Sequence, residues 1–203
     1  MTVDRARLAG AALRLAPRLL GAVVVSDVGG AEVAVRLTEV EAYEGADDPA
    51  SHAFRGPTRR TEVMFGRPGH LYCYFTYGMH WCANIVCGTE GHAAAVLLRA
   101  GEIVRGVDAA HARRPAARAV RDLARGPARL ATCLALDAGT SGVDLCDPAS
   151  PVRLESMRTR RLPGVVSGPR VGIAVATERP WRFWVSGDPS VSAFKAGGRT
   201  RQT

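Results

Sequence analysis

Two glutamates and a tyrosine, Glu39, Glu41 and Tyr43, alternate along a short segment and could together do hydrolytic chemistry. The residues before them, 33–37, show the period-2 alternation of a half-buried strand. If that pleat continues, we expect all three side chains on the face that carries the apolar residues. An unpaired carboxylate is costly in a core, whereas a pocket could use it to activate a water beside a ring that stacks a flat substrate. The competing interpretation is an edge strand that runs out into solvent.

Residues 70–86 are rich in aromatic side chains and are predicted to form two strands joined by a tight turn at Tyr77-Gly78. Glycine tolerates the positive φ that such a turn needs. On the first strand, Tyr72 and Tyr74 are expected on one side. Tyr77 would then occupy the hairpin tip, where an exposed ring could wedge into a base stack. Alternatively, this ring packs on its own hairpin.

The charge balance favours a polyanionic partner. The chain has 203 residues, the size of one domain, with 27 Lys and Arg against 19 Asp and Glu, a net charge of +8. Because 26 of the 27 cations are Arg, a GC-rich coding sequence could explain part of the excess. Three groups could bind phosphate or form an ordinary solvated surface: Arg59, Arg60 and Arg67; Arg113 and Arg114; and Arg158, Arg160 and Arg161.

Cysteine usage and apolar patterning argue against a secreted or membrane protein. The five cysteines form no C-x-x-C pair, so we expect reduced, mostly buried thiols in the cytoplasm. The apolar stretch 8–25 contains two arginines and Pro17, which disfavours a membrane span or a signal sequence. It is predicted instead to hold an amphipathic helix that is broken or kinked near Pro17.

The remaining pattern predicts a mixed α/β (α+β) chain without repeats or an interdomain linker. The first 194 residues are expected to form one domain and residues 195–203 a disordered tail. Loops at 45–58 and 148–170 are long enough to be functional. The predicted strands cover 93–100, 171–176 and 181–185, and the predicted helices cover 116–125 and 127–136, the second with proline in its first turn.

Many separate motifs, in order and spacing, closely resemble the alkyladenine (3-methyladenine) DNA glycosylase family. The resemblance runs from about residue 8 to 193 and implies one compact domain with a curved, mainly antiparallel sheet, flanking helices and a protruding β-hairpin. The matching motifs are Thr38-Glu39-Val40-Glu41-Ala42-Tyr43, Ser51-His52, Met64-Phe65, Pro68-Gly69, Leu71-Tyr72, Tyr74, Tyr77-Gly78-Met79, Asn84, Leu97-Leu98-Arg99, Gly126-Pro127-Ala128-Arg129-Leu130, Gly168-Pro169-Arg170-Val171-Gly172-Ile173 and Trp181-Arg182-Phe183.

The resemblance implies a reaction and a catalytic group. Hydrolysis of a purine–deoxyribose bond passes through an oxocarbenium-like sugar that water attacks, and the family motif puts its general base at Glu41. Glu39 is the alternative base within this chain, and the match favours Glu41. Arg99 ends an apolar strand, so it should pair with a carboxylate or the water, in line with the family's active-site arginine; a structural ion pair elsewhere is the alternative. The Val171 backbone matches a segment that helps to hold the water.

The resemblance also implies how a base is recognised after it is flipped out of the duplex. Tyr77, with Met79 beside it, would intercalate into the DNA and fill the gap. Substrate-binding roles fall to Tyr43 on one face of the base, to His52 and Tyr74 on the other, to Tyr72 on the pocket wall, and to Asn84, which would crowd the exocyclic amine of guanine.

Three other functions remain open at this point. A glycosidase acting on free nucleosides would need neither the wedge nor the basic charge. A non-catalytic nucleic-acid-binding domain would not need a carboxylate and an arginine beside stacking tyrosines. A metal hydrolase could use Glu44, Asp47, Asp48 and His52.

From the resemblance we expect a monofunctional enzyme, with no metal and no cofactor, because water is the nucleophile. The only lysine, Lys195, lies in the Gly-rich tail. The N-terminal amine could replace it in principle, but it precedes a predicted helix and no motif places it near Glu41, so we expect no Schiff base. The expected substrate is double-stranded DNA with alkylated or deaminated purines, and the product is an abasic site for a separate endonuclease in base excision repair. We expect a cytoplasmic monomer used at the nucleoid, without membrane contact.

Overall fold

The computed structural model describes residues 3–157 and 162–197; the predicted patch at Arg158, Arg160 and Arg161 and the end of the predicted tail lie outside them. As predicted, the described residues form one α+β domain with a mainly antiparallel sheet. They contain three α-helices, α1 (Ala12–Leu19), α2 (Val107–Arg113) and α3 (Pro127–Cys133), and eight strands: β1 (Val23–Ser26), β2 (Val33–Tyr43), β3 (Leu71–Thr76), β4 (His80–Val86), β5 (Ala95–Arg105), β6 (Val152–Ser156), β7 (Val165–Gly168) and β8 (Arg182–Val185).

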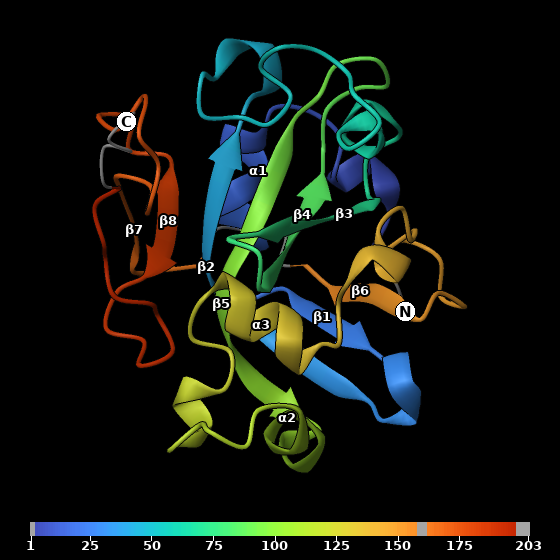
Figure 1. The fold of residues 1–203 in the computed structure, drawn as a ribbon, viewed down its shortest axis with the longest axis vertical. Coiled ribbons are helices and arrows are strands. Elements are labelled where there is room, and N and C mark those ends of the chain that lie inside the picture. Colours follow the sequence, from blue (N-terminus) through green and yellow to red (C-terminus); the bar gives the residue numbers. More distant parts are fainter. Residues whose placement is uncertain (1–2, 158–161, 198–203) are drawn as a thin grey trace.

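The sheet is built around two long neighbouring strands, β2 and β5 (Figure 1). Its order is β3-β4-β5-β2-β1-β6, and β8 pairs with β2 and with β7. The first half of β2 pairs with β1, whereas residues 39–41 pair with β8. Because β8 replaces β1 as the neighbour of β2 at this point, the end of β2 with its two glutamates lies beside β8.

A bulge in β2 changes which face its side chains occupy. Leu37 pairs with Gly101 and Glu39 with Ala100, so Thr38 is an extra residue on β2. One extra residue reverses the alternation of side chains across the strand. The apolar residues before the bulge and Val40 after it belong to the main core, whereas Glu41 faces a pocket on the other side. The prediction that the glutamates share the face of residues 33–37 was therefore wrong.

The main core lies between the sheet and the helices, with α1 behind the sheet and α3 in front of it in Figure 1. Helix α1 is continuous through Pro17, so the predicted break there is absent. Its N-terminus is capped from the end of β2, because the Leu13 N–H donates to Glu44 Oε1 over 2.7 Å. The capping contact ties this helix to the strand that carries Glu41 and Tyr43.

The helix predicted over 116–125 is absent. This part of the chain contains only a 3₁₀ turn, Val120–Asp122, because its carbonyl groups bond elsewhere. The Arg114 guanidinium donates to two of them, and Ala124 O accepts from the Gly101 N–H at the middle of β5. Helix α3 begins at Pro127 as predicted but ends at Cys133. Helix α2 was not predicted.

The strand predicted over 171–176 is also absent, and these residues form bends without a ladder partner. The loop predicted over 148–170 instead contributes β6 and β7 to the sheet. Gly172 donates its N–H to Lys195 O over 3.1 Å, and a Cβ on Gly197 would meet Ile173 O at 2.0 Å. The start of the predicted tail therefore contacts the segment that carries Val171.

All five cysteines are free thiols, and four of them are buried. Within the described ranges, none of the helices has the length and apolar character needed to cross a membrane.

Candidate active site

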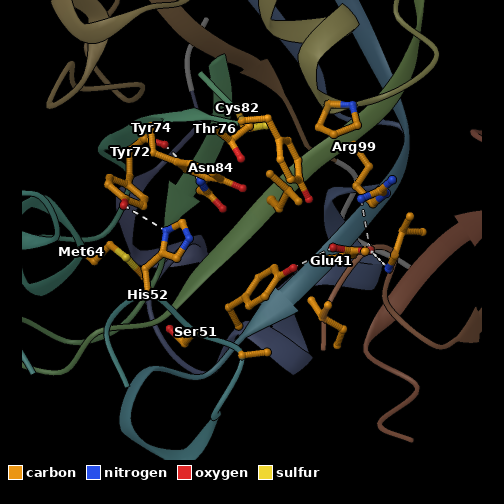
Figure 2. A pocket seen from close by; sticks show the side chains of 18 residues that line it. Glu41, Ser51, His52, Met64, Tyr72, Tyr74, Thr76, Cys82, Asn84 and Arg99 are labelled. Atoms are coloured by element: carbon orange, nitrogen blue, oxygen red, sulfur yellow. Dashed lines mark hydrogen bonds and ion pairs between the residues drawn. The ribbon is translucent and has the colours of Figure 1, made fainter. Parts of the chain in front are cut away.

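A pocket of about 330 Å³ is lined by side chains of β2, β3, β4 and β5 that alternate along these strands with residues of the main core (Figure 2). This volume falls within the range of small-molecule sites. The bulge in β2 and the matching extra residue in β5, Arg99, turn polar side chains towards it. Nine of the ten predicted site residues line it, and Met79 does not; the nine are Glu41, Tyr43, His52, Tyr72, Tyr74, Tyr77, Asn84, Arg99 and Val171.

Glu41 is fully buried, and three donors converge on its carboxylate. Oε1 accepts the Val171 N–H at 2.7 Å and lies 3.3 Å from Arg99 Nη1, and Oε2 accepts the Tyr43 hydroxyl at 2.8 Å. An ionised carboxylate offers about four acceptor positions and no proton of its own. Protein groups take three of these positions, which leaves one acceptor position of the carboxylate unfilled by the described residues.

Arg99 links the two glutamates of β2. Its Nε donates to Glu39 Oε1 at 2.9 Å, while Nη1 faces Glu41. Glu39 does not line the pocket and is enclosed by donors, including Arg182 Nε at 2.7 Å. The pairing of Arg99 with a carboxylate agrees with the sequence prediction. Of the two glutamates, only Glu41 can meet a ligand.

The Tyr43 ring forms one wall of the pocket and is supported from behind by Arg170. The guanidinium carbon of Arg170 lies 4.6 Å from the centre of this ring and 5.0 Å from that of Trp181. Burial, with the Glu41 carboxylate next, raises the pKa of Tyr43 well above its usual value. The hydroxyl therefore keeps its proton and remains a donor to Glu41.

The opposite wall consists of His52, Tyr72 and Tyr74, as Figure 2 shows. The two tyrosine rings are stacked with centres 5.7 Å apart, and the imidazole meets Tyr74 edge-on at 4.5 Å. His52 Nδ1 lies 3.1 Å from the Tyr72 hydroxyl. Burial and then the nearby Arg60 charge lower the pKa of His52 to about 4. The imidazole is therefore neutral near pH 7.

Asn84 lies on β4 between the two walls. Its amide group donates to the Tyr72 carbonyl over 3.1 Å, which fixes the orientation of the side chain. The amide is buried at the base of the pocket and restricts the shape of a ligand there.

Tyr77 stands at the tip of the β3–β4 hairpin, as predicted. Thr76 pairs with His80, and the Met79 N–H bonds to Thr76 O at 3.2 Å. Tyr77 and Gly78 have φ angles of 51° and 66°, the positive values of a type I′ turn. Tyr77 is 78% exposed and Met79 67% exposed, so neither packs on the hairpin.

Two of the four residues considered for a metal site have other partners. Glu44 caps α1, and Asp48 forms a bidentate ion pair with Arg170. Across the part of the chain that the structure describes, no three His, Cys, Asp or Glu side chains are grouped so as to hold a metal ion. The metal-hydrolase alternative therefore has no site among these residues.

The sequence profile of the Methylpurine-DNA glycosylase (MPG) family matches residues 6–189. The chain belongs to this family. Members are hydrolases that act on N-glycosyl bonds in DNA, so the protein is an enzyme of DNA repair and DNA is its substrate.

Curated bacterial relatives, provisionally named 3-methyladenine DNA glycosylases, are similar over nearly their whole length. The chain is 51% identical over 186 residues to the one from Streptomyces avermitilis, covering 91% of this chain and 87% of that protein. It is 52% identical over 199 residues to that of Frankia casuarinae, with 93% and 91% covered. For Mycobacterium tuberculosis the identity is 46% over 189 residues, with 91% and 90% covered.

Sequence reasoning missed the residues that support the glycosylase pocket. Arg170 and Asp48 form a fully buried pair, yet they are 122 positions apart and no local pattern connects them. Glu39 was predicted only as an alternative general base to Glu41. Its bond to Arg99, the arginine that faces Glu41, was not predicted. The β2 bulge did leave a signal, because the apolar alternation changes phase between Leu37 and Val40.

Proposed function

We propose that this methylpurine-DNA glycosylase is monofunctional: it flips an alkylated or deaminated purine out of duplex DNA and hydrolyses its N-glycosidic bond with a water activated by Glu41. The observation that carries the proposal is the Glu41 carboxylate, held by three donors at one end of a pocket walled by aromatic rings. Alkylation weakens the glycosidic bond and lets the purine leave as a neutral base, so one well-placed carboxylate and one water suffice for the chemistry. A deaminated purine leaves as an anion and takes up a proton from water.

In this mechanism the purine stacks between Tyr43 and the wall of His52 and Tyr74. As the glycosidic bond breaks, positive charge develops on the deoxyribose, and the Glu41 carboxylate stabilises it. Water attacks the anomeric carbon from the face opposite the base, and Glu41 takes its proton. Arg99 and the Val171 N–H keep the carboxylate in place and leave one acceptor position for the water.

Flipping requires a group that fills the vacated space in the duplex. Tyr77 suits this role because it is exposed at the tip of a hairpin and also lines the pocket mouth. Met79 stands beside it and is exposed as well. The exposed arginines Arg59, Arg60 and Arg67 precede the hairpin and would contact phosphates. Arg113 and Arg114 are less suited, since both donate to backbone carbonyls.

The pocket also suggests which purines are excluded. The amide of Asn84 is fixed at its base, so an exocyclic amine of normal guanine would meet it there. Neutral rings on both walls favour the electron-poor ring of 3-methyladenine, whereas 7-methylguanine keeps the exocyclic amine that would meet Asn84; hypoxanthine and ethenoadenine lack that amine.

We propose that the products are a free purine and an intact abasic strand, which a separate endonuclease would cut. The enzyme would work as a monomer in the cytoplasm, at the nucleoid, where its DNA substrate lies and where unpaired thiols persist.

The test is incubation of the protein with duplexes that each carry one defined lesion, followed by cleavage at abasic sites. We expect cleavage at alkylated purines and none in undamaged duplex. The same lesions are supplied as free nucleosides in a parallel arm. Base release from nucleosides but not from duplex would contradict the proposal and favour a nucleoside glycosidase.

A further inference from the structure

We propose that Ser192, acting with Glu39, is a positioning residue that holds the Arg99 guanidinium against Glu41. This inference rests on the proposed function, in which Glu41 is the general base. Neither residue lines the pocket, so both would act through Arg99. Ser192 also lies beyond residue 189, where the match to the family profile ends.

Glu39 is the centre of a buried charge network. Its Oε1 accepts Arg99 Nε at 2.9 Å, Arg182 Nε at 2.7 Å and the Ser192 hydroxyl at 2.9 Å. Its Oε2 accepts the Ser192 N–H at 2.7 Å. With Glu41, the network contains two carboxylates and two guanidiniums, so it is neutral as a whole. A buried charge network of this kind is weak evidence that its members stabilise the fold. We therefore interpret it by how it positions the side chains near Glu41.

Among the hydrogen bonds of the described residues, Ser192 is the one residue after β8 that contacts both Glu39 and Arg99. Its hydroxyl donates to Glu39 and lies 3.4 Å from Arg99 Nη2. Arg99 Nε and Nη1 are already committed to Glu39 and Glu41. A planar guanidinium that is contacted at all three nitrogens has less freedom to turn than one contacted at two. The hydroxyl therefore sets the angle at which Arg99 meets Glu41.

The segment that carries Ser192 is itself anchored on both sides. The Ser190 hydroxyl lies 2.8 Å from that of Thr38, the extra residue of the β2 bulge, and donates to Asp188. On the other side, Lys195 O accepts the Gly172 N–H next to Val171. The segment thus connects the bulge, Arg99 and the loop that donates to Glu41.

The test compares Ser192→Ala with the wild type on a duplex that carries one lesion. We expect the single-turnover excision rate to fall on the order of tenfold, because a small misplacement of a catalytic group slows chemistry. Affinity for the lesion duplex should change by less than about twofold, since no substrate contact is lost. Ser192→Thr keeps the hydroxyl and should restore most of the rate.

Ser190→Ala is the matched control. It removes a buried hydroxyl from the same segment without touching Arg99, so it should lower thermal stability at least as much as Ser192→Ala while leaving the rate unchanged. Glu39→Asp is a second variant that keeps the charge but withdraws the carboxylate from Arg99, and it should also slow excision without weakening binding.

Equal rates for Ser192→Ala and the wild type, or equal rate losses in the two serine variants, would overturn the positioning role alone. An inactive wild type on every lesion duplex would overturn the proposed function and this inference together.

Discussion

At Glu41, the number of hydrogen-bond donors decides how the carboxylate can act. Val171, Arg99 and Tyr43 occupy three of its acceptor positions, and the raised pKa of Tyr43 keeps that hydroxyl a donor. The Glu39 carboxylate has no acceptor position that faces the pocket, because Arg99, Arg182 and Ser192 surround it. Two glutamates of the same strand thus have distinct surroundings: Glu41 lines the pocket and Glu39 does not.

We expect Glu41→Gln to abolish base release while retaining tight binding to lesion-containing duplex. The amide keeps the shape of the side chain but cannot take a proton from water, and loss of a general base costs about 10²–10⁴-fold. Single-turnover excision measures the effect, with Glu39→Gln as the control that should lose much less. A Glu41→Gln rate within about tenfold of wild type would contradict the assignment.

His52 should remain neutral at working pH. Its pKa in the folded protein is about 4, below the usual value of 6.5, so the unfolded chain binds more protons between these values. Its contribution to stability is therefore complete above pH 6.5 and is lost as the pH falls towards 4. The effect is modest because the ring is partly open to solvent at the pocket.

Titration of the imidazole resonances by NMR tests this expectation, with His52→Asn to assign the signal. A midpoint near 6.5 for His52 would show that the ring is not held in its neutral form. The pH dependence of the excision rate should likewise contain no step near pH 6.5 that comes from His52. If such a step is seen, it should still be present in His52→Asn.

At the scale of elements, one ion pair joins three segments that form the pocket. Arg170 bonds to Asp48 with both terminal nitrogens and also donates to Ala42 O at the end of β2. Asp48 begins the loop that carries His52, and Arg170 precedes Val171. The pair therefore sets how the loop, the strand and the Glu41-binding segment lie relative to one another. Among the residues that the structure describes, its Nε is buried without a hydrogen-bond partner.

We expect Arg170→Gln to destabilise the fold by about 3–5 kcal/mol, because it leaves the buried Asp48 carboxylate with only the more distant Arg179 guanidinium, at 4.0 Å, as a cationic partner. Adding Asp48→Asn removes that charge and should recover part of the loss. Urea unfolding followed by tryptophan fluorescence measures both. If the double variant is no more stable than Arg170→Gln, the two side chains are not coupled as the structure indicates.

The sequence was most informative where a pattern is local. The alternation before Glu39 predicted β2, and the glycine at Tyr77-Gly78 predicted the hairpin turn. The bulge at Thr38 was missed because continued alternation was assumed across it. The chain near Arg125 was predicted as a helix because Ala and Arg favour helices, but its carbonyls bond to Arg114 and to β5. Contacts between distant residues, such as Asp48 with Arg170, have no local signature.

At the scale of the whole molecule, the cations are almost all of one kind. Twenty-six arginines and one lysine leave Lys195 as the only side-chain amine. Its backbone contacts Gly172, close to the pocket, but its side chain is exposed and is not among the residues that line the cavity. A Schiff-base nucleophile must reach the reacting carbon of the substrate, and this side chain does not line the pocket.

We therefore expect borohydride added during turnover to trap no covalent protein–DNA adduct, since water is the nucleophile in the proposed mechanism. Denaturing electrophoresis of labelled lesion duplex checks this, with a bifunctional glycosylase as the positive control. An adduct that vanishes in Lys195→Ala would mean that the tail amine reaches the anomeric carbon and that the enzyme also cuts the strand.

The turn that carries Tyr77 has a consequence for the engineering of this enzyme. A bulky residue at a φ of 51° is strained, and glycine there would relieve that strain. We expect Tyr77→Gly to stabilise the fold by about 0.5–1 kcal/mol, less than the full strain because glycine also loosens the unfolded chain. The same change should weaken lesion-specific binding by roughly 1–3 kcal/mol, the stacking of one ring, while binding to undamaged DNA changes little.

Thermal unfolding and duplex titrations can be run on the same preparation of Tyr77→Gly. Equal losses on damaged and undamaged duplex would assign the ring a purely structural role. Otherwise, selection for heat resistance would tend to remove this tyrosine, and selection for repair would retain it: the tip of the hairpin is a site where durability and activity demand different residues.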